Sequence, residues 1–342
     1  MRVGAPVIPR AVFGGILARD LVEVTSDLGV LEGTGRWAVA LPYSGWPILA
    51  RFDTWEPWDG HAGTWVGPRP EEWACAMDQE SYERAVAETR EQVAAGLVYQ
   101  ANICRVLSAP IGHDSDVLAL HAILNAGNPA PFGGCLSLPE QAVHIATASP
   151  ELFLSVTMSP KGRVIRSGPI KGTGRNEEDL TDKDRAENVM IVDLVRNDLS
   201  QVCIPGTVAV PQLMQVEHHP GLVHLVSYVE GLMVPSATWQ GIVDATFPPG
   251  SVTGAPKSSA LRLIERLEPA PREFYCGAIG WVDADEGTAC LAVAIRTFWH
   301  DGHTLKFGTG AGITWGSDST AEWHETELKA ERLIRLASQG RS

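Results

Sequence analysis

The sequence lacks several features that would assign it to a familiar class of protein. Its six cysteines include no CxxC pair and no Cys/His spacing typical of zinc, so neither a disulfide scaffold nor a zinc module is favoured. No apolar run approaches the length that crosses a membrane, and the first ten residues lack the apolar core of a signal peptide. We therefore expect a cytoplasmic protein with no membrane partner.

Positive charge is also scarce. The chain has 27 Lys and Arg against 41 Asp and Glu, a net charge of −14 at pH 7 that is spread along the sequence. Binding to a phosphate backbone requires clustered basic residues, so the composition argues against a nucleic-acid partner. A small anionic substrate is compatible with it, because such a ligand needs only a local positive pocket.

What is present is typical of a globular enzyme. The 342 residues are 44% hydrophobic and 20% charged, which is enough to bury a sizeable core. Residues 1–75 are rich in Gly, Pro and Trp and predict short strands and turns that form part of the fold. From there the pattern changes to longer elements, which continue to about residue 338.

Helical spacing and capping residues predict helices at 81–95, 116–124, 182–197, 256–268 and 321–337. Apolar and β-branched runs predict strands at 97–106, 163–166, 223–232 and 289–298, and a strand, turn and strand across 132–155. The two types do not alternate regularly. A doubly wound parallel sheet is therefore not favoured, and the elements indicate a mixed α/β protein of the α+β type.

Three helical carboxylates are candidate metal ligands. Glu187 lies in one predicted helix, while Glu322 and Glu325 lie three residues apart on another and share a face. A solvated acidic surface is the ordinary explanation for such a pair. Carboxylates that converge from separate helices would instead suit Mg²⁺, which prefers oxygen ligands.

Lys171 stands in the segment RSGPIKGTGR, where a tight loop restricts its movement. It could be a surface lysine in a turn. The functional alternative is a nucleophilic amine, activated by burial or by a neighbouring cation.

Glycine-rich turns and isolated polar residues give weaker signals. The run from Gly308 to Gly312 could cradle a carboxylate with its amides, whereas GSVTGAPK lacks the spacing of a P-loop. His224 lies in an apolar strand, where a histidine usually satisfies the core. Arg296 also lies in an apolar strand and needs an anionic partner there.

Ten segments, in this order, resemble the chorismate-utilising enzymes, which include anthranilate synthase component I, aminodeoxychorismate synthase component I and the isochorismate and salicylate synthases. They are YQANICR, SPELFL, PIKGTGR, DRAENVMIVDLVRNDL, HLVSYVEG, FPPGSVTGAPK, YCGAIGW, AIRT, GAGIT and AEWHETELKA. The resemblance runs from about Asp78 to Leu336 and makes residues 76–338 the expected chorismate-binding catalytic core.

The resemblance implies two large, mostly antiparallel sheets flanked by helices, with the active site between them. It also implies Mg²⁺ as cofactor, with Glu187 and Glu322 as ligands and Glu325 beside them, holding the ring carboxylate of chorismate. Glu151 becomes the general acid that protonates the departing 4-hydroxyl. The remaining substrate-binding positions that it implies are Arg296, Gly310, Gly312, Lys329, His224, Thr253, Tyr275, Gly172 and Gln100.

Two positions divide the family. Gln100 stands where the enzymes that use water carry a lysine base, so water is disfavoured as the nucleophile. Lys171 stands where anthranilate synthases typically carry alanine, which is the aminodeoxychorismate pattern. The resemblance therefore favours amination of chorismate at C4, with Lys171 as covalent nucleophile, on the branch that leads to p-aminobenzoate and folate.

Two other functions are weighed against it. Synthesis of anthranilate or 2-amino-2-deoxyisochorismate would place the amine on C2 instead. A catalytically dead binding subunit would require loss of the metal carboxylates or Glu151, and all are present. No glutaminase segment is seen, so we expect ammonia from a separate glutamine amidotransferase subunit or from solution.

Overall fold

The computed structural model describes residues 8–112, 115–174, 176–219 and 222–339. The α-helices in these ranges are α1 (Gln79–Ala94), α2 (Val117–Gly127), α3 (Asp182–Ser200), α4 (Trp239–Thr246), α5 (Lys257–Leu267) and α6 (Ser319–Ala337). The strands of the first half are β1 (Arg10–Phe13), β2 (Ile16–Thr25), β3 (Arg36–Leu41), β4 (Ile48–Pro57), β5 (Ala74–Cys75), β6 (Gln100–Pro110), β7 (Phe132–Leu138), β8 (Val143–Ser149) and β9 (Leu152–Ser159). Those of the second half are β10 (Gly162–Gly168), β11 (Ile170–Gly174), β12 (Ala209–His219), β13 (Leu222–Leu232), β14 (Gly254–Ala255), β15 (Ala278–Asp283), β16 (Thr288–Val293), β17 (Thr297–His300) and β18 (Thr304–Ile313).

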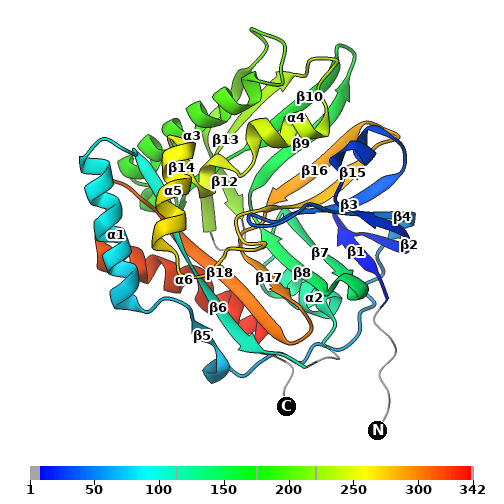
Figure 1. The fold of residues 1–342 in the computed structure, drawn as a ribbon, viewed down its shortest axis with the longest axis horizontal. Coiled ribbons are helices and arrows are strands. Elements are labelled where there is room, and N and C mark those ends of the chain that lie inside the picture. Colours follow the sequence, from blue (N-terminus) through cyan, green and yellow to red (C-terminus); the bar gives the residue numbers. More distant parts are fainter. Residues whose placement is uncertain (1–7, 113–114, 175, 220–221, 340–342) are drawn as a thin grey trace.

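The described strands form one antiparallel network. Pairing runs from β6 through β18, β17, β8 and β7 to β1, and from β2 through β4, β3, β15, β16, β9 and β10 to β13. In Figure 1 this path leads from the lower centre, round the right-hand side, to the top. The expected antiparallel pairing is confirmed. The expected division into two separate sheets is wrong at the level of hydrogen bonding, because β2 pairs with both β1 and β4 and joins the two halves.

Side-chain caps explain where the helices begin. Asp78 accepts a hydrogen bond from the Ser81 amide, so α1 starts two residues before the predicted position. Thr181 and Asp184 form a reciprocal capping box at the start of α3, which confirms the helix predicted from residue 182.

One expected strand is divided in two. Residues 289–298 were predicted as a single strand, but β16 ends at Val293 and β17 begins at Thr297. Arg296, between them, has a left-handed backbone with φ of 52°. A strand cannot continue through that conformation, and the break allows β16 to pair with β9 while β17 pairs with β8.

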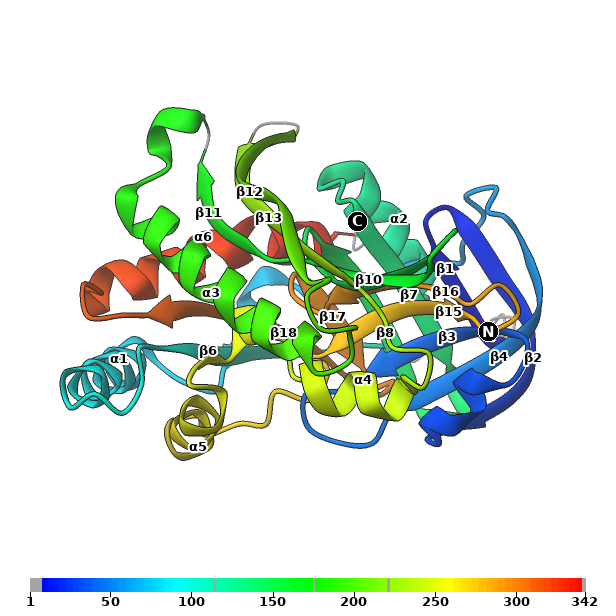
Figure 2. The same ribbon diagram turned by 90° about the horizontal axis from the view of Figure 1, so that it is seen from above.

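Four of the helices pack on strands at the end of the network that contains β6, β18, β11 and β13. Both α1 and α5 contact β6, α6 contacts β18, and α3 contacts β11 and β13. Figure 2 shows α3 and α6 on the same side of the molecule, at the end away from the N-terminal strands. No helix in the described part of the chain is long and apolar enough to span a membrane.

Candidate active site

Lys171 lies at an irregularity in β11 that directs its side chain. The register of β11 against β13 shifts between Ile170 and Thr173, as in a β-bulge. Gly172, within the shift, has φ of +89°, and a Cβ there would lie 2.9 Å from the Cβ of Asp184. Only glycine suits such a backbone, so Gly172 shapes the turn that presents Lys171.

The Lys171 amine lies in a polar setting built from distant segments. Its Nζ donates to the Ser251 carbonyl at 3.3 Å. A Cβ added to Gly312 would lie 3.3 Å from the same Nζ and 2.5 Å from Gln100 Nε2, so glycine is needed there for space. Gln100 is fully buried, and neither of its amide atoms has a hydrogen-bond partner in the described part of the chain. An unpaired buried amide is costly, so it suits a ligand that would complete it.

Glu151 lies between β8 and β9 and is 4% exposed. Its amide donates to the Ser149 hydroxyl, and its carbonyl accepts from the Val293 amide, so its backbone is fixed. Burial raises the pKa of Glu151 to about 7, although the Ser251 hydroxyl, the Lys171 ammonium and the Ile170 amide act to lower it. A carboxyl group with this pKa can donate a proton near neutral pH, which fits a general acid.

Glu187 of α3 and Glu322 of α6 approach one another around a lysine. The Lys183 ammonium lies 3.1 Å from Glu322 Oε1 and 3.8 Å from Glu187 Oε1. Burial raises the pKa of Glu187, against the opposing effects of Lys171 and Lys183. Sequence reasoning missed Lys183, although its position four residues before Glu187 on one helix was a usable signal.

Glu325 is engaged differently from the other two carboxylates. It pairs with Lys329 at 2.6 Å, and although burial acts to raise its pKa, Lys329, Lys183 and Lys171 together lower it. Within the described ranges, no three His, Cys, Asp or Glu residues are grouped closely enough to hold a metal on their own.

The pair formed by Glu187 and Glu322 nevertheless fits Mg²⁺, which commonly takes one or two carboxylates and completes its shell with water and substrate oxygens. Glu187 Oε1 is buried and accepts no hydrogen bond from the described residues. Such an oxygen needs a cation, and in this structure Lys183 supplies the nearest one.

The Gly310 and Gly312 amides are open to an anion. Gly310 faces Cys104 and Gly312 faces Asn102 across the pairing of β18 with β6. The Cys104 and Asn102 amides donate elsewhere, to Glu268 and to the Thr253 carbonyl, so these are the pairs without ladder hydrogen bonds. The glycine amides therefore point away from β6. The Gly310 carbonyl points the same way and accepts from Lys329 at 3.0 Å.

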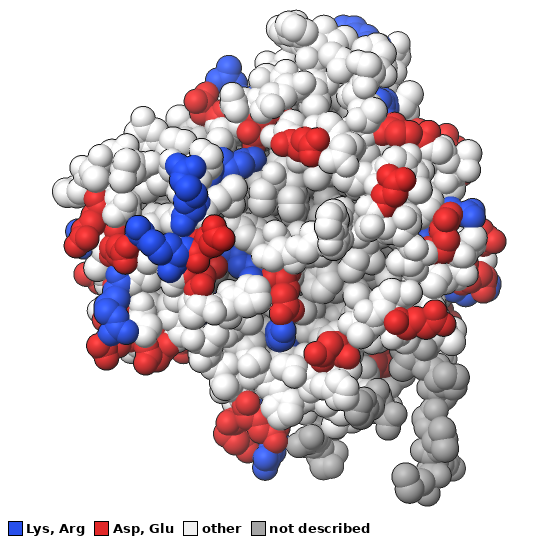
Figure 3. Space-filling view, viewed as in Figure 1, with Lys and Arg blue, Asp and Glu red and all other residues white. Residues whose placement is uncertain are grey.

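Arg296 offers a further cation for an anionic group. Burial lowers the pKa of its guanidinium, and in the described residues that guanidinium makes no hydrogen bond or ion pair. A partly buried charge without a partner favours an anionic ligand. Figure 3 shows that the largest gathering of Lys and Arg on the visible face lies on its left half, where Figure 1 places α3 and α6, while Asp and Glu are spread across it.

The other residues expected in the pocket are buried and make contacts within the fold. The Thr253 hydroxyl donates to the Pro249 and Gly250 carbonyls, which occupies its proton. His224 is buried in β13, opposite Thr173 of β11. The Tyr275 ring lies where a Cβ on Gly308 would be, and burial raises the pKa of its phenol. Gly308, Gly310 and Gly312 share one side of β18, so Tyr275 and Gln100 both pack against that side of the strand.

Sequence reasoning also missed Ser251, which stands within the GSVTGAPK segment that it had singled out.

Comparison with known proteins identifies the family of this site. The family model for chorismate binding enzyme matches residues 63–335. Anthranilate synthase component 1 of Saccharolobus solfataricus is 37% identical over 270 residues, covering 75% of this chain and 62% of that protein. Aminodeoxychorismate synthase component 1 of Escherichia coli is 34% identical over 276 residues, covering 77% of this chain and 59% of that protein. The match thus spans about three fifths of the length of these relatives.

Solved structures agree on the fold. Anthranilate synthase component I from Streptococcus pneumoniae superposes with a TM-score of 0.79 at 22% identity, covering 98% of this chain and 94% of that one. A 2,3-dihydroxybenzoate-specific isochorismate synthase from Bacillus anthracis gives a TM-score of 0.79 at 23% identity, covering 96% of each chain.

Proposed function

The chain belongs to the chorismate-binding enzymes, and from that premise we propose that it aminates chorismate at C4 to give 4-amino-4-deoxychorismate, on the branch leading to p-aminobenzoate and folate. The observation that carries the proposal is a lysine amine beside a protonatable acid in one buried site. Lys171 and Glu151 meet at Ser251, whose carbonyl accepts from the lysine and whose hydroxyl binds the glutamate.

These residues divide the displacement into two steps. The Lys171 amine attacks C2 of chorismate while the ring double bond shifts and the 4-hydroxyl departs as water with a proton from Glu151. Ammonia then attacks C4, the double bond shifts back, and the bond to Lys171 breaks, which returns the free amine. The sum is chorismate plus ammonia giving the 4-amino product plus water, and the covalent intermediate replaces one difficult step by two easier ones.

The same site has groups to hold the substrate. Arg296 and the amides of Gly310 and Gly312 would bind its carboxylates, and Gln100 would meet a polar group of the ring. Glu187 and Glu322 would hold Mg²⁺, which would neutralise the ring carboxylate when bound. Gln100 is neutral, so it would not serve as a base for water.

We infer that ammonia reaches the site from a separate glutamine amidotransferase subunit or from solution. The relatives are named as component 1, which supports a second component. Relatives named as anthranilate synthase match equally well, so synthesis of a 2-amino product is the rival. Lys171 favours the C4 product. In the rival reaction ammonia itself adds at C2, so no lysine nucleophile is needed at that carbon.

The test is incubation with chorismate, Mg²⁺ and ammonium, with the product identified by mass and retention time. We expect 4-amino-4-deoxychorismate, no turnover with glutamine as the nitrogen source, and no product from Lys171→Ala. Anthranilate or 2-amino-2-deoxyisochorismate as the main product of the unmodified chain would refute amination at C4 and leave the family membership intact.

A further inference from the structure

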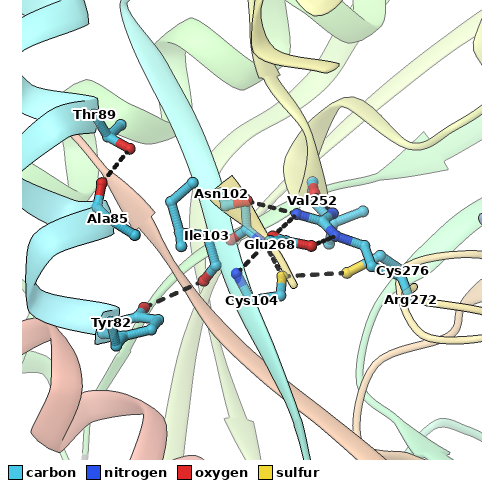
Figure 4. Close-up of polar contacts among 10 residues, drawn as sticks. All are labelled: Tyr82, Ala85, Thr89, Asn102, Ile103, Cys104, Val252, Glu268, Arg272 and Cys276. Carbon is cyan, nitrogen blue, oxygen red and sulfur yellow. Dashed lines mark hydrogen bonds and ion pairs between the residues drawn. The ribbon is translucent and has the colours of Figure 1, made fainter. Parts of the chain in front are cut away.

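Arg272 is almost completely buried, so its positive charge requires hydrogen-bond acceptors and a negative partner close by. It is 2% exposed, and it follows α5 in the loop that leads to β15. Its guanidinium makes two hydrogen bonds to Glu268, at 2.8 Å from Nε and 2.6 Å from Nη2. Figure 4 shows this pair at the centre of a group of polar contacts around β6.

The remaining donors of Arg272 tie two backbone segments together. Nη1 donates to the Val252 carbonyl at 2.8 Å, and Nη2 donates to the Asn102 carbonyl at 2.6 Å. Glu268 also accepts from the Cys104 amide at 2.8 Å. The ion pair therefore fastens β6 to the 3-10 turn Gly250–Val252, as the dashed lines of Figure 4 trace.

That turn carries the groups that contact the two reacting side chains. Ser251, next to Val252, gives its carbonyl to Lys171 and its hydroxyl to Glu151. Two residues on, Gly254 and Ala255 of β14 pair with Ala101 and Gln100 of β6. A shift of this turn relative to β6 would therefore move the contacts of Lys171 and Glu151 against Gln100.

We propose that Arg272 is a positioning residue for the reaction, because its guanidinium, held by Glu268, fixes the Gly250–Val252 turn against β6 and so sets where Lys171 and Glu151 meet the substrate. The inference rests on the proposed roles of those two residues. Arginine is needed because a planar fork reaches two carbonyls and a carboxylate at once, whereas the single ammonium of lysine cannot.

The test is Arg272→Lys, which keeps the charge and loses the fork. We expect kcat to fall about tenfold or more while KM for chorismate stays within about threefold, because the carboxylate-binding groups lie elsewhere. The matched control is Arg10→Lys, the same substitution at a partly buried pair with Asp116 that joins β1 to the start of α2. It should leave both constants within twofold.

A second readout does not depend on turnover. Acetic anhydride labelling, quantified by mass spectrometry, compares the Lys171 amine with that of Lys161, an exposed lysine outside the site. In Arg272→Lys the relative labelling of Lys171 should rise at least threefold, because the Ser251 carbonyl no longer holds the amine. Unchanged labelling, or equal losses of kcat in both arginine variants, would overturn the proposal.

A double variant, Arg272→Met with Glu268→Met, guards against misfolding by leaving no unpaired charge in the interior. It should fold, as judged by its circular dichroism spectrum, and repeat both the loss of kcat and the change in labelling; a double variant with normal kcat would overturn the proposal. If the unmodified chain fails to aminate chorismate while labelling responds as expected, the proposed function is wrong and the positioning of Lys171 by Arg272 still holds.

Discussion

Replacing Lys183 by methionine should tighten the binding of Mg²⁺. The ammonium lies between the two carboxylates that would hold the metal, 3.1 Å from Glu322 and 3.8 Å from Glu187. Although burial acts to lower the pKa of Lys183, Glu322, Glu187 and Glu325 together raise it, so the side chain is charged. A dication that takes these oxygens must first displace that charge.

The size of the effect follows from the distances and the exposure. Two unit charges about 4 Å apart attract by about 1 kcal/mol in water and by about 4 kcal/mol at an effective dielectric constant of about 20. The side chain of Lys183 is 44% exposed, so the value near that of water applies. Losing about 1 kcal/mol of competition should lower the Kd for Mg²⁺ about fivefold.

Isothermal titration calorimetry with MgCl₂ measures this without substrate. Lys161→Met, which removes an exposed lysine outside the site, is the matched control and should not change the Kd. Without Mg²⁺, Lys183→Met should also unfold at a lower temperature, because Glu187 and Glu322 then repel each other. Unchanged or weaker Mg²⁺ binding in Lys183→Met would show that these two carboxylates are not the metal site.

Three further predictions test the site and the core. Lys171→Ala and Lys171→Arg should both abolish formation of the 4-amino product, and the unmodified enzyme should yield a covalent adduct on the Lys171 peptide by mass spectrometry; an active Lys171→Arg without adduct would defeat the covalent step. With free ammonia held constant, kcat/KM should fall as the pH rises through about 7, because Glu151, whose burial raises its pKa to about 7, must be protonated to act. His121 and His300 should make the fold sensitive to acid, because burial lowers their pKa values to about 4 and about 3 and the unfolded chain binds their protons first. Stability should be fully present above about pH 6.5 and fall by about 2 kcal/mol for each histidine at pH 5, which urea unfolding at the two pH values would measure; an equal free energy of unfolding at both would contradict it.

Local signals in the sequence predicted five of the six α-helices in the described residues, whereas α4 was not predicted. The cap at Thr181 and the apolar spacing after it depend only on neighbouring residues, and α3 begins where they predict. Pairing between strands depends on distant partners, which is why the break at Arg296 was not foreseen. Its left-handed backbone is needed so that β16 and β17 can pair with different strands, and nothing in the local residues AIRT requires it.

The same distinction applies to the site. The resemblance selected Glu151, Lys171 and Gln100, and the structure brings them together. It could not select Ser251 or Lys183, whose importance comes from where their atoms lie relative to those residues. The spacing of Glu322 and Glu325 correctly placed them on one helix, but spacing does not reveal that Lys329 engages only the second.

The N-terminal strands should prove necessary for the stability of residues 63–335, which match the family model. The family match begins at residue 63, yet β1 pairs with β7 and β3 pairs with β15, so strands before the match cover the edges of strands within it. Both edges are apolar and would be left with unpaired backbone groups if residues 1–57 were removed, and exposed edges of this kind promote aggregation. A chain of residues 58–342 should therefore be largely insoluble or aggregated, and refolding with a separate peptide of residues 8–57 should recover soluble protein. A monomeric, cooperatively unfolding truncated chain would show that β7 and β15 tolerate free edges and that the two halves of the strand network hold together without β2 joining them.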